Sequence, residues 1–428
     1  MMYYPLLNDI LFHIKWTLTI LTSFCFLYYI FLGLFSFKKI KTWPKITDKK
    51  HRFAVVIPAR NEEKVIGFLI DSLHAQVYDK TLFDIFVLAD NCTDRTAEYA
   101  MAKGAAVYER FDSTKQTKGF ALSWFFDKFF ADHKDKYDAV CMFDADNVAD
   151  KSFLSEMNEQ LCMGKELAQG YSDAKNPSDS WISGSYALFF YTNMRFLQRP
   201  KYNLGLSCML RGTGFMVRTS VLEESGWNTS TMCEDIEFSL YKIAEGRKIS
   251  FAHKAKFYDE HPVSFKQSWR QRMRWTAGNF MCIFKCGPKL ITNKKITRFQ
   301  ALDSIMFLLA IPCVIGSAVS VLLDVVLNLL NIQNLIHTYP LMLLFLSASF
   351  ITTLAQGLIV ALLEKKKIKP LLKGILMYPF FMLSYIIITV WGTIKQDKIW
   401  KPIIHAKTFS IEDIKERHNN KKKKRADV

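Results

Sequence analysis

The sequence predicts an α/β domain inserted between membrane-spanning α-helices. Three features predict this class: an uncharged apolar stretch near the N-terminus, alternating strand and helix patterns over residues 52–262, and long apolar stretches after residue 297. Half of the 428 residues are hydrophobic, yet the formal net charge is +17. This combination favours a lipid bilayer or an anionic substrate as partner. Nucleic acid is not an expected partner, because zinc-finger spacings, RNP-like runs and basic heptad helices do not occur.

The first apolar stretch, residues 16–37, carries no charge. At about 1.5 Å per residue it is long enough to cross a hydrocarbon layer of about 30 Å. Lys38, Lys39 and Lys41 follow at once. Because basic residues gather on the cytoplasmic side, we expect a multi-pass protein of the plasma membrane whose catalytic domain is cytoplasmic. A cleaved signal peptide would be shorter and would end in small residues.

Residues 52–265 show the pattern of a soluble α/β domain. The runs "FAVVIP" (53–58) and "DIFVLAD" (84–90) are rich in β-branched and aromatic residues and end in loop residues, as buried parallel strands do. A third strand, "AVCMFDAD" (139–146), ends in acidic residues. The segments between the first strands have helical spacing. This alternation predicts a sheet with crossover connections and a ligand site at the strand C-termini.

Three later stretches are long enough to span a membrane: 304–323, 339–363 and 374–394. Basic "EKKKIKP" is predicted inside and uncharged "NIQNLIHTYP" outside. One span before the domain and three after it would place the basic tail outside. Pro379 in the last stretch permits a re-entrant or interfacial helix instead, which would keep the tail inside. The predicted units are 1–51 (helix and linker), 52–265 (α/β domain), 266–300 (amphipathic interfacial helices), 301–395 (membrane helices) and 396–428 (basic tail).

Two carboxylates, Asp144 and Asp146, follow the third strand. Alternate residues at a strand end aim two side chains at one pocket. A hard divalent cation prefers such oxygens and keeps water and substrate phosphates as its other ligands. Asp-x-Asp alone also fits solvated acids in a turn, but its place after an apolar strand favours a metal site.

Glu234 and Asp235 open a helical stretch. Acids are favoured there by the helix dipole, and a carboxylate in this position also suits a general base that takes a proton from an attacking hydroxyl. Paired carboxylates occur in glycosidases too, but those enzymes need neither a nucleotide site nor membrane helices.

Other polar residues stand at or near the predicted strand ends: Asp90 after the second strand, Pro58, Ala59, Arg60 and Glu62 after the first, and Lys118 further along. Asp90 is suited to hydrogen bonds from a base or ribose, and Lys118 to a diphosphate. None of these segments is a Gly-rich phosphate loop, so a P-loop and a dinucleotide fingerprint are both excluded.

The stretch "SWRQRMRWTAGNFMCIF" is amphipathic and precedes the apolar C-terminal part. Such a helix is expected to lie in the membrane interface, with Trp and Phe toward lipid and arginines toward water. It contains "QRMRW" at residues 271–275.

In order, Asp90, Asp144 with Asp146, Glu234 with Asp235, and "QRMRW" resemble the motifs of family 2 glycosyltransferases. More narrowly, they resemble those of the membrane-embedded processive synthases of cellulose, hyaluronan, chitin oligosaccharides and poly-N-acetylglucosamine. The resemblance covers about residues 52–275. It implies a GT-A (Rossmann-like) fold, Mg²⁺ or Mn²⁺, and an inverting hexosyl transfer from UDP-glucose or UDP-N-acetylglucosamine. The acceptor would be a growing β-linked polysaccharide that is exported across the membrane.

The resemblance also implies roles by position. Pro58, Ala59, Arg60, Glu62, Asp90, Lys118, Asp144, Gln271 and Arg274 would bind the nucleotide sugar; Asp146 and Asp144 the metal; Asp235, beside Glu234, would be the base; Gly212, Thr213, Gly214 and Trp275 would bind the acceptor. The sequence departs from the family at Cys233, where many members have threonine, and at Ala89, where a second aspartate is frequent.

Two alternatives stay open. A polyprenyl-phosphate glycosyltransferase, which adds a single sugar to a lipid, shares the fold and the acidic motifs but generally lacks Gln-x-x-Arg-Trp. A non-catalytic membrane scaffold with a transferase-like domain predicts lost carboxylates, whereas all of them are present here.

Overall fold

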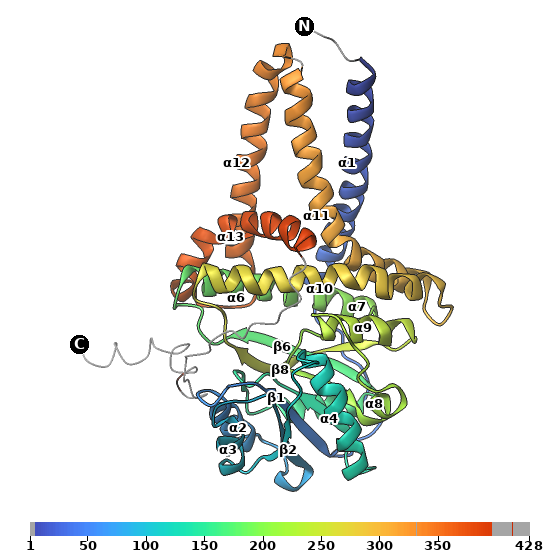
Figure 1. Cartoon of the computed structure of the whole chain (residues 1–428), viewed down its shortest axis with the longest axis vertical. Helices are drawn as coiled ribbons and strands as arrows, with labels where there is room; N and C mark the ends of the chain where they lie inside the picture. The colour runs from blue at the N-terminus through green and yellow to red at the C-terminus, as the bar shows by residue number, and fades with distance from the viewer. Residues whose placement is uncertain (1–4, 331, 396–412, 414–428) are drawn as a thin grey trace, which may run out of the picture.

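The computed structural model of the chain describes residues 5–330, 332–395 and 413. Figure 1 shows an α/β domain at the bottom, a layer of helices lying across its upper face, and long helices rising from that layer. The predicted tail at 396–428 lies outside the described residues, except for residue 413.

One eight-stranded sheet forms the centre of the α/β domain, in the order β3-β2-β1-β4-β7-β6-β8-β5. Its strands are β1 (Phe53–Ala59), β2 (Phe83–Asp90), β3 (Ala106–Arg110), β4 (Ala139–Met142), β5 (Val148–Ala149), β6 (Leu167–Ala174), β7 (Phe215–Arg218) and β8 (Ile249–Asp259). Strands β1 to β4 are parallel, whereas β7 runs antiparallel between β4 and β6. The sheet is therefore mixed. Strand β4 ends at Met142, so both acids of the Asp-x-Asp pair lie in the loop after it.

Helices cover both faces of the sheet, which explains why its central strands are apolar along their whole length. One face packs on α2 (Ile66–His74), α3 (Thr96–Ala102) and α5 (Phe153–Cys162). The other packs on α4 (Lys118–Asp132) and α9 (Glu234–Ala244). The shorter helices are η1 (Phe35–Phe37), η2 (Lys80–Leu82), η3 (Met194–Gln198), α7 (Arg199–Leu204) and α8 (Thr219–Ser225).

The crossing layer consists of α6 (Trp181–Asn193), α10 (Phe265–Thr292) and α13 (Ile368–Ile394). Helices α6 and α13 cross at Gly184 and Gly374, where a Cβ on Gly374 would lie 2.5 Å from the carbonyl carbon of Gly184. Any larger residue would push the two backbones apart. Most of the amphipathic stretch predicted at 266–300 forms α10, which shares a cavity with the strand ends.

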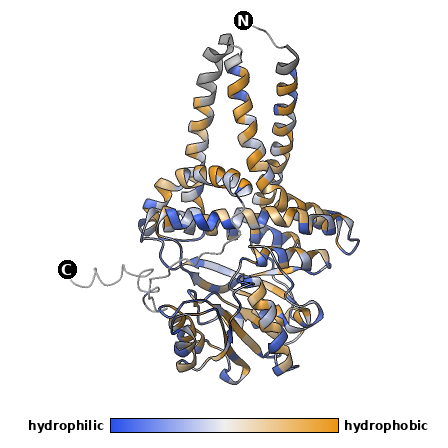
Figure 2. Cartoon of the chain, viewed as in Figure 1, coloured by the Kyte–Doolittle hydropathy of each residue, from blue (hydrophilic) through white to orange (hydrophobic). Residues whose placement is uncertain are grey.

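Among the described residues, four helices are long and apolar enough to cross a membrane: α1 (Pro5–Leu34), α11 (Arg298–Leu330), α12 (Ile332–Leu363) and α13. Figure 2 shows their mostly hydrophobic colouring. Helices α1, α11 and α12 rise away from the domain, but α13 lies across them within the crossing layer (Figure 1). The direction of α13 is the one that an interfacial helix would have, and the interfacial placement of the last apolar stretch stays a prediction.

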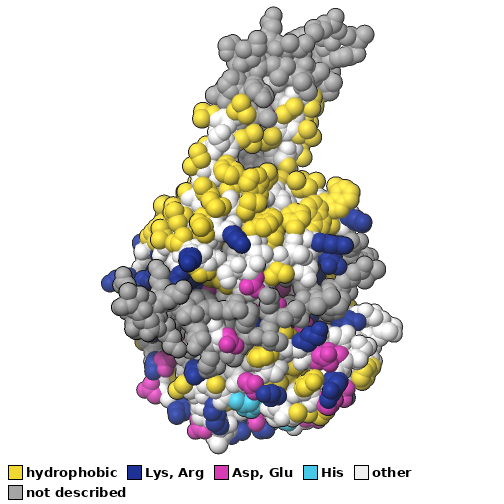
Figure 3. Space-filling view, turned by 90° about the vertical axis from the view of Figure 1, so that its left-hand side faces the viewer, with side chains coloured by type: hydrophobic (Ala, Val, Ile, Leu, Met, Phe, Trp, Pro, Cys, Tyr) yellow, Lys and Arg dark blue, Asp and Glu magenta, His cyan; other side chains and the backbone are white. Residues whose placement is uncertain are grey.

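Buried polar contacts fix the long helices on the domain. Tyr28 of α1 donates a hydrogen bond of 2.6 Å to Asp303 of α11, and Lys201 of α7 lies 3.0 Å from the same carboxylate. The connection between α12 and α13 reaches the sheet, because Tyr171 of β6 donates to Glu364 at 2.6 Å. Figure 3 shows hydrophobic side chains gathered around the helical part, with acidic side chains mainly on the domain below.

Candidate functional site

A cavity of about 560 Å³ lies between the C-terminal ends of β1, β2 and β4 and the lower face of α10. Parallel strands that end at one edge bring their loops together there, so this is where an α/β sheet binds ligands. Every residue predicted for the site lines this cavity except Gly214.

The loops after β1 and β2 hold each other in place. Asn61 adopts a left-handed backbone conformation (φ 58°), and its side-chain oxygen accepts a hydrogen bond of 2.8 Å from the Thr93 amide. The amide of Glu62 in turn donates to Thr96 Oγ1 at 2.8 Å. These bonds fix Arg60 and Glu62 at the rim of the pocket.

Asp90 lies at the end of β2 and lines the pocket, but its carboxylate is already engaged. Arg110 at the end of β3 donates a bond of 2.6 Å to Asp90 Oδ1, and both side chains are buried. Burial of a paired carboxylate and guanidinium fixes their relative positions. A ligand would therefore contact an Asp90 side chain whose orientation is set by Arg110.

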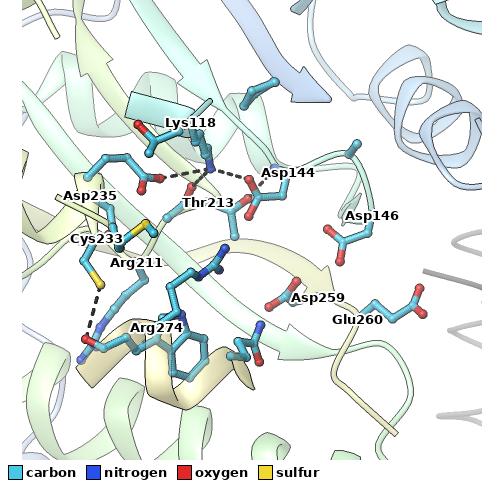
Figure 4. Close-up of a pocket in the computed structure, with 18 of the residues that line it drawn as sticks. Lys118, Asp144, Asp146, Arg211, Thr213, Cys233, Asp235, Asp259, Glu260 and Arg274 are labelled. Carbon is cyan, nitrogen blue, oxygen red and sulfur yellow. Dashed lines mark hydrogen bonds and ion pairs between the residues drawn. The ribbon is translucent and has the colours of Figure 1, made fainter. Parts of the chain in front are cut away.

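Lys118, the first residue of α4, points into the pocket next to Asp144 (Figure 4). Its Nζ lies 2.5 Å from Asp144 Oδ1, 2.8 Å from the Gly212 carbonyl and 3.6 Å from Glu234. Burial lowers the pKa of Lys118, but the Asp144 and Glu234 charges outweigh burial, and its pKa lies above the usual value. The pocket thus contains a permanent cation next to the predicted nucleotide and base residues.

Acidic side chains crowd the other side of the pocket, where Figure 4 shows Asp146, Asp259 and Glu260. Burial, with added repulsion from Asp146 and Asp144, raises the pKa of Glu62 to about 9. The same causes raise the pKa of Asp259 well above its usual range. A cation bound between these carboxylates would offset the repulsion among their negative charges.

The donor chemistry of this acidic side therefore fits a hard divalent cation. Within residues 5–330 and 332–395, no group of three or more His, Cys, Asp or Glu side chains is close enough to hold a metal by itself.

Asp235 lies in the first turn of α9, as its sequence pattern predicts, and is partly buried. Burial and the neighbouring Glu234 charge raise the pKa of its carboxyl to about 7. Its Oδ2 is 3.7 Å from the point that a Cβ on Gly212 would occupy, so the turn at Gly212 leaves room beside it. A carboxylate with this pKa is suited to exchange a proton near neutral pH.

Helix α10 closes the pocket on the side of the long apolar helices. Gln271, Arg274 and Trp275 face the cavity, as their i, i+3 and i+4 spacing on a helix allows. Gln271 Oε1, Arg274 Nε and Asn279 Oδ1 are buried and have no hydrogen-bond partner among the described residues. Buried polar atoms are rarely left unpaired, so these three are available for a ligand.

The expectation that α10 points its Trp toward lipid and its arginines toward water is wrong for two residues. Trp275 lines the cavity and packs edge-on against Tyr186 and Phe190. Arg272 is fully buried; it donates to the Phe381 carbonyl at 3.1 Å and lies 4.3 Å from the Phe381 ring centroid. Arg272 thus joins α10 to α13, which the amphipathic pattern did not indicate because α13 is distant in sequence.

Cys233, the departure from the family pattern, has a packing role. Its Sγ donates to the Trp275 carbonyl at 3.5 Å, and a Cβ on Gly278 would lie 2.5 Å from that sulfur. Helices α9 and α10 therefore approach closely at this point, which places Asp235 and Trp275 in one cavity.

Gly214 does not line the pocket. Its φ is 61°, and a Cβ there would overlap the ring of Phe257. Its carbonyl instead accepts a hydrogen bond of 2.8 Å from the Gly170 amide. Sheet packing therefore accounts for this glycine.

Several lining residues were not predicted from the sequence: Phe189, Phe190, Asp259, Glu260, His261, Asn279 and Tyr385. For Asp259 and Glu260 a signal exists, because "ISFAHKAKFYDE" is a strand that ends in acids like the third predicted strand. The aromatic residues of α6 and α13 carry no such signal, since their chemistry is that of ordinary core residues.

Comparison with known proteins agrees with this geometry. A family model described as "Glycosyltransferase like family 2" matches residues 51–278. The probable glycosyltransferase YdaM of Bacillus subtilis (strain 168) is 27% identical over 263 residues, which cover 58% of this chain and 60% of that protein. A beta-monoglucosyldiacylglycerol synthase of Nostoc sp. is 23% identical over 267 residues, 60% of this chain and 54% of that protein. The chain thus spans a little over half the length of these relatives.

A solved structure, the mannosyltransferase PcManGT from Pyrobaculum calidifontis in complex with GDP-Man and Mn²⁺, is similar with a TM-score of 0.58. The alignment is 17% identical and covers 91% of this chain and 100% of that chain. At this identity the likeness is one of fold. The predicted GT-A-like α/β fold is confirmed, with a mixed sheet.

Proposed function

Because this chain belongs to the glycosyltransferase-like family 2, we propose that it transfers a hexose from a nucleotide-diphosphate sugar to an acceptor hydroxyl. The nucleotide would be UDP. The acceptor hydroxyl would reach the pocket from the membrane side. One observation carries the proposal: the unpaired atoms of Gln271, Arg274 and Asn279 face a cavity whose opposite wall is acidic. A ligand that carries both a diphosphate and hydroxyl groups would satisfy both walls.

The nucleotide sugar would lie over the strand ends, with its nucleoside toward Asp90 and its diphosphate toward Lys118 and Arg274. The negative charge on the diphosphate grows as the sugar leaves. A fixed ammonium and a forked guanidinium offset that charge, and removing such a contact typically costs about 3 kcal/mol of transition-state stabilisation.

The chain's acidic wall would hold the metal through Asp146 and Asp144, with Asp259 close by. When bound, Mg²⁺ or Mn²⁺ would add positive charge next to the leaving diphosphate.

The transfer would be a single displacement. Asp235 takes the proton of the acceptor hydroxyl, whose oxygen attacks the anomeric carbon from the face opposite the diphosphate. The bond from that carbon to the diphosphate oxygen breaks, and UDP leaves. An α-linked donor then gives a β-linked product. Trp275 presents a flat aromatic face to the acceptor, which suits the C–H face of a sugar or an apolar chain.

Processive polysaccharide synthesis with export is a second candidate. It is favoured by the Gln-x-x-Arg-Trp motif, whose Gln271, Arg274 and Trp275 all line the pocket beside the membrane helices. A membrane-borne acceptor of another kind is equally compatible with that position. The name of the Nostoc relative, a beta-monoglucosyldiacylglycerol synthase, supports a hexose donor and an acceptor that resides in the membrane.

The test is turnover by the purified full chain in nanodiscs. UDP-glucose, UDP-N-acetylglucosamine and GDP-mannose are supplied singly with Mg²⁺ or Mn²⁺, and nucleotide release and product are measured together. We expect metal-dependent release of UDP from one UDP-sugar. Failure to bind or consume any nucleotide sugar would contradict the proposal.

A further inference from the structure

A second cavity, of about 620 Å³, lies among α1, α6, η3 and α11, directly above the domain. Most of its wall is aromatic or aliphatic; its lining includes Phe26, Ile30, Phe196, Phe307 and Ile311. Its walls belong largely to helices that are long and apolar enough to cross a membrane. We call it the apolar chamber. Nothing in the transfer mechanism above uses it.

The chamber and the catalytic pocket share part of their lining. Phe189, Arg211, Asn279 and Tyr385 line both cavities. Arg211 directly precedes Gly212, which borders Asp235. The two cavities therefore meet next to the proposed base, and a molecule that fills the chamber can present one end to the reacting atoms.

Polar atoms without partners stand at this junction. Arg211 Nε and Asn279 Oδ1 are buried and have no hydrogen-bond partner within the described part of the chain. Arg211 uses another nitrogen to donate to Asn193 Oδ1 at 2.6 Å. One unpaired donor and one unpaired acceptor at the inner end of an apolar space indicate an occupant with a polar head and an apolar body.

The residues that line the chamber favour a hydrocarbon chain over a sugar polymer as its occupant. A sugar polymer carries several hydroxyl groups per residue, and each one that is buried without a hydrogen bond weakens binding. Most of the chamber's wall offers no such partners. A hydrocarbon chain needs none, and each CH₂ group that it buries strengthens binding.

We propose that the chamber holds the hydrocarbon chain of a membrane lipid whose head-group hydroxyl is the sugar acceptor, with Arg211 and Asn279 binding the head group beside Asp235. This inference rests on the proposed function and names its acceptor class. A hydroxyl is the expected group because it must lose a proton to attack. A lipid phosphate is already mostly ionised at neutral pH and needs no base.

The experiment uses the full chain in nanodiscs with a labelled UDP-sugar and the divalent cation. Three acceptors are compared: dioleoylglycerol, undecaprenyl phosphate, and no added lipid acceptor. Label is counted in the organic phase and in the water-soluble fraction, and the lipid product is sized. We expect one sugar on dioleoylglycerol and at least tenfold less label in the other two arms.

A matched pair of variants tests the chamber itself. Ile30→Trp adds bulk to the wall of the chamber, whereas Ile20→Trp makes the same change at an exposed position of α1 that does not line it. We expect Ile30→Trp to lower transfer to dioleoylglycerol at least tenfold, and Ile20→Trp to stay within twofold of the native chain. UDP binding by each variant serves as the folding control.

Three results would overturn the inference while leaving the proposed function intact: label only in a water-soluble polymer, label only on undecaprenyl phosphate, or equal lipid transfer by both variants. Absence of nucleotide-sugar binding and cleavage in every arm is a different outcome, because it removes the proposed function and the inference together.

Discussion

The ammonium nitrogen of Lys118 lies 2.5 Å from a carboxylate oxygen of Asp144. The same nitrogen is 3.6 Å from Glu234. One partly buried cation therefore joins the proposed nucleotide side of the pocket to the proposed base side. Its loss should affect both.

Replacing Lys118 by methionine keeps the length of the side chain and removes its charge. We expect kcat/KM for the nucleotide sugar to fall about 100-fold or more, because a cation facing the leaving diphosphate is lost. Lys103→Met is the matched control: Lys103 forms an exposed ion pair with Asp71, whose loss costs little. Equal rates for the two variants would contradict the role of Lys118.

The pH profile of kcat/KM should report the proposed base. Burial and Glu234 raise the pKa of Asp235 to about 7, and only the ionised carboxylate accepts a proton. The rate should therefore rise as the pH increases from 5.5 to 8.5, with its midpoint near 7. In Lys118→Met the midpoint should move higher, since the Lys118 charge lowers this pKa. A flat profile would be evidence against Asp235 as the base.

Chelation of divalent cations should stop turnover, and added Mn²⁺ or Mg²⁺ should restore it. Asp259→Asn removes one of the crowded carboxylates, so the metal concentration for half-maximal activity should rise about tenfold or more. Asp48→Asn changes an exposed aspartate far from the pocket and serves as the control. Full activity in EDTA would refute metal dependence.

Gly214 should matter for stability rather than for acceptor binding. Gly214→Ala places a methyl group on the Phe257 ring at a positive φ, and should lower the free energy of unfolding by about 1–3 kcal/mol. Gly205→Ala has a similar φ of 71° but meets nothing within 4 Å. It should cost about 1 kcal/mol at most, from backbone strain alone. Thermal unfolding of both variants in detergent measures the difference.

The sequence could predict the parts of the fold that have strong local patterns. Apolar runs that end in loop or acidic residues predict strands β1, β2 and β4 and the acids at or just after their ends. The start of α9 is predicted in the same way. Strand β7 is four residues long and pairs antiparallel with neighbours distant in sequence. A run that short has no period to detect, so the mixed character of the sheet was not predictable.

The acidic site residues at the strand ends could be predicted from the sequence. The site residues that come together only because helices pack against one another could not. Asn279, Arg211 and Tyr385 come from three segments that only the crossing of α10 and α13 over the domain brings together. Arg272 was indistinguishable from Arg274 by composition, yet one is buried against α13 and the other faces the pocket. Which face of α10 is buried depends on α13, and that contact is not local.

Single-turnover sugar transfer by Asp235→Asn is the most direct test of the proposed chemistry. Labelled UDP-sugar transfer and UDP affinity are measured on the same preparation, with Asp48→Asn as the control. We predict UDP affinity within about threefold of the native chain and transfer slowed by about 100-fold or more, the usual contribution of a general base. Transfer by Asp235→Asn at the native rate would show that this carboxylate does not take the acceptor's proton.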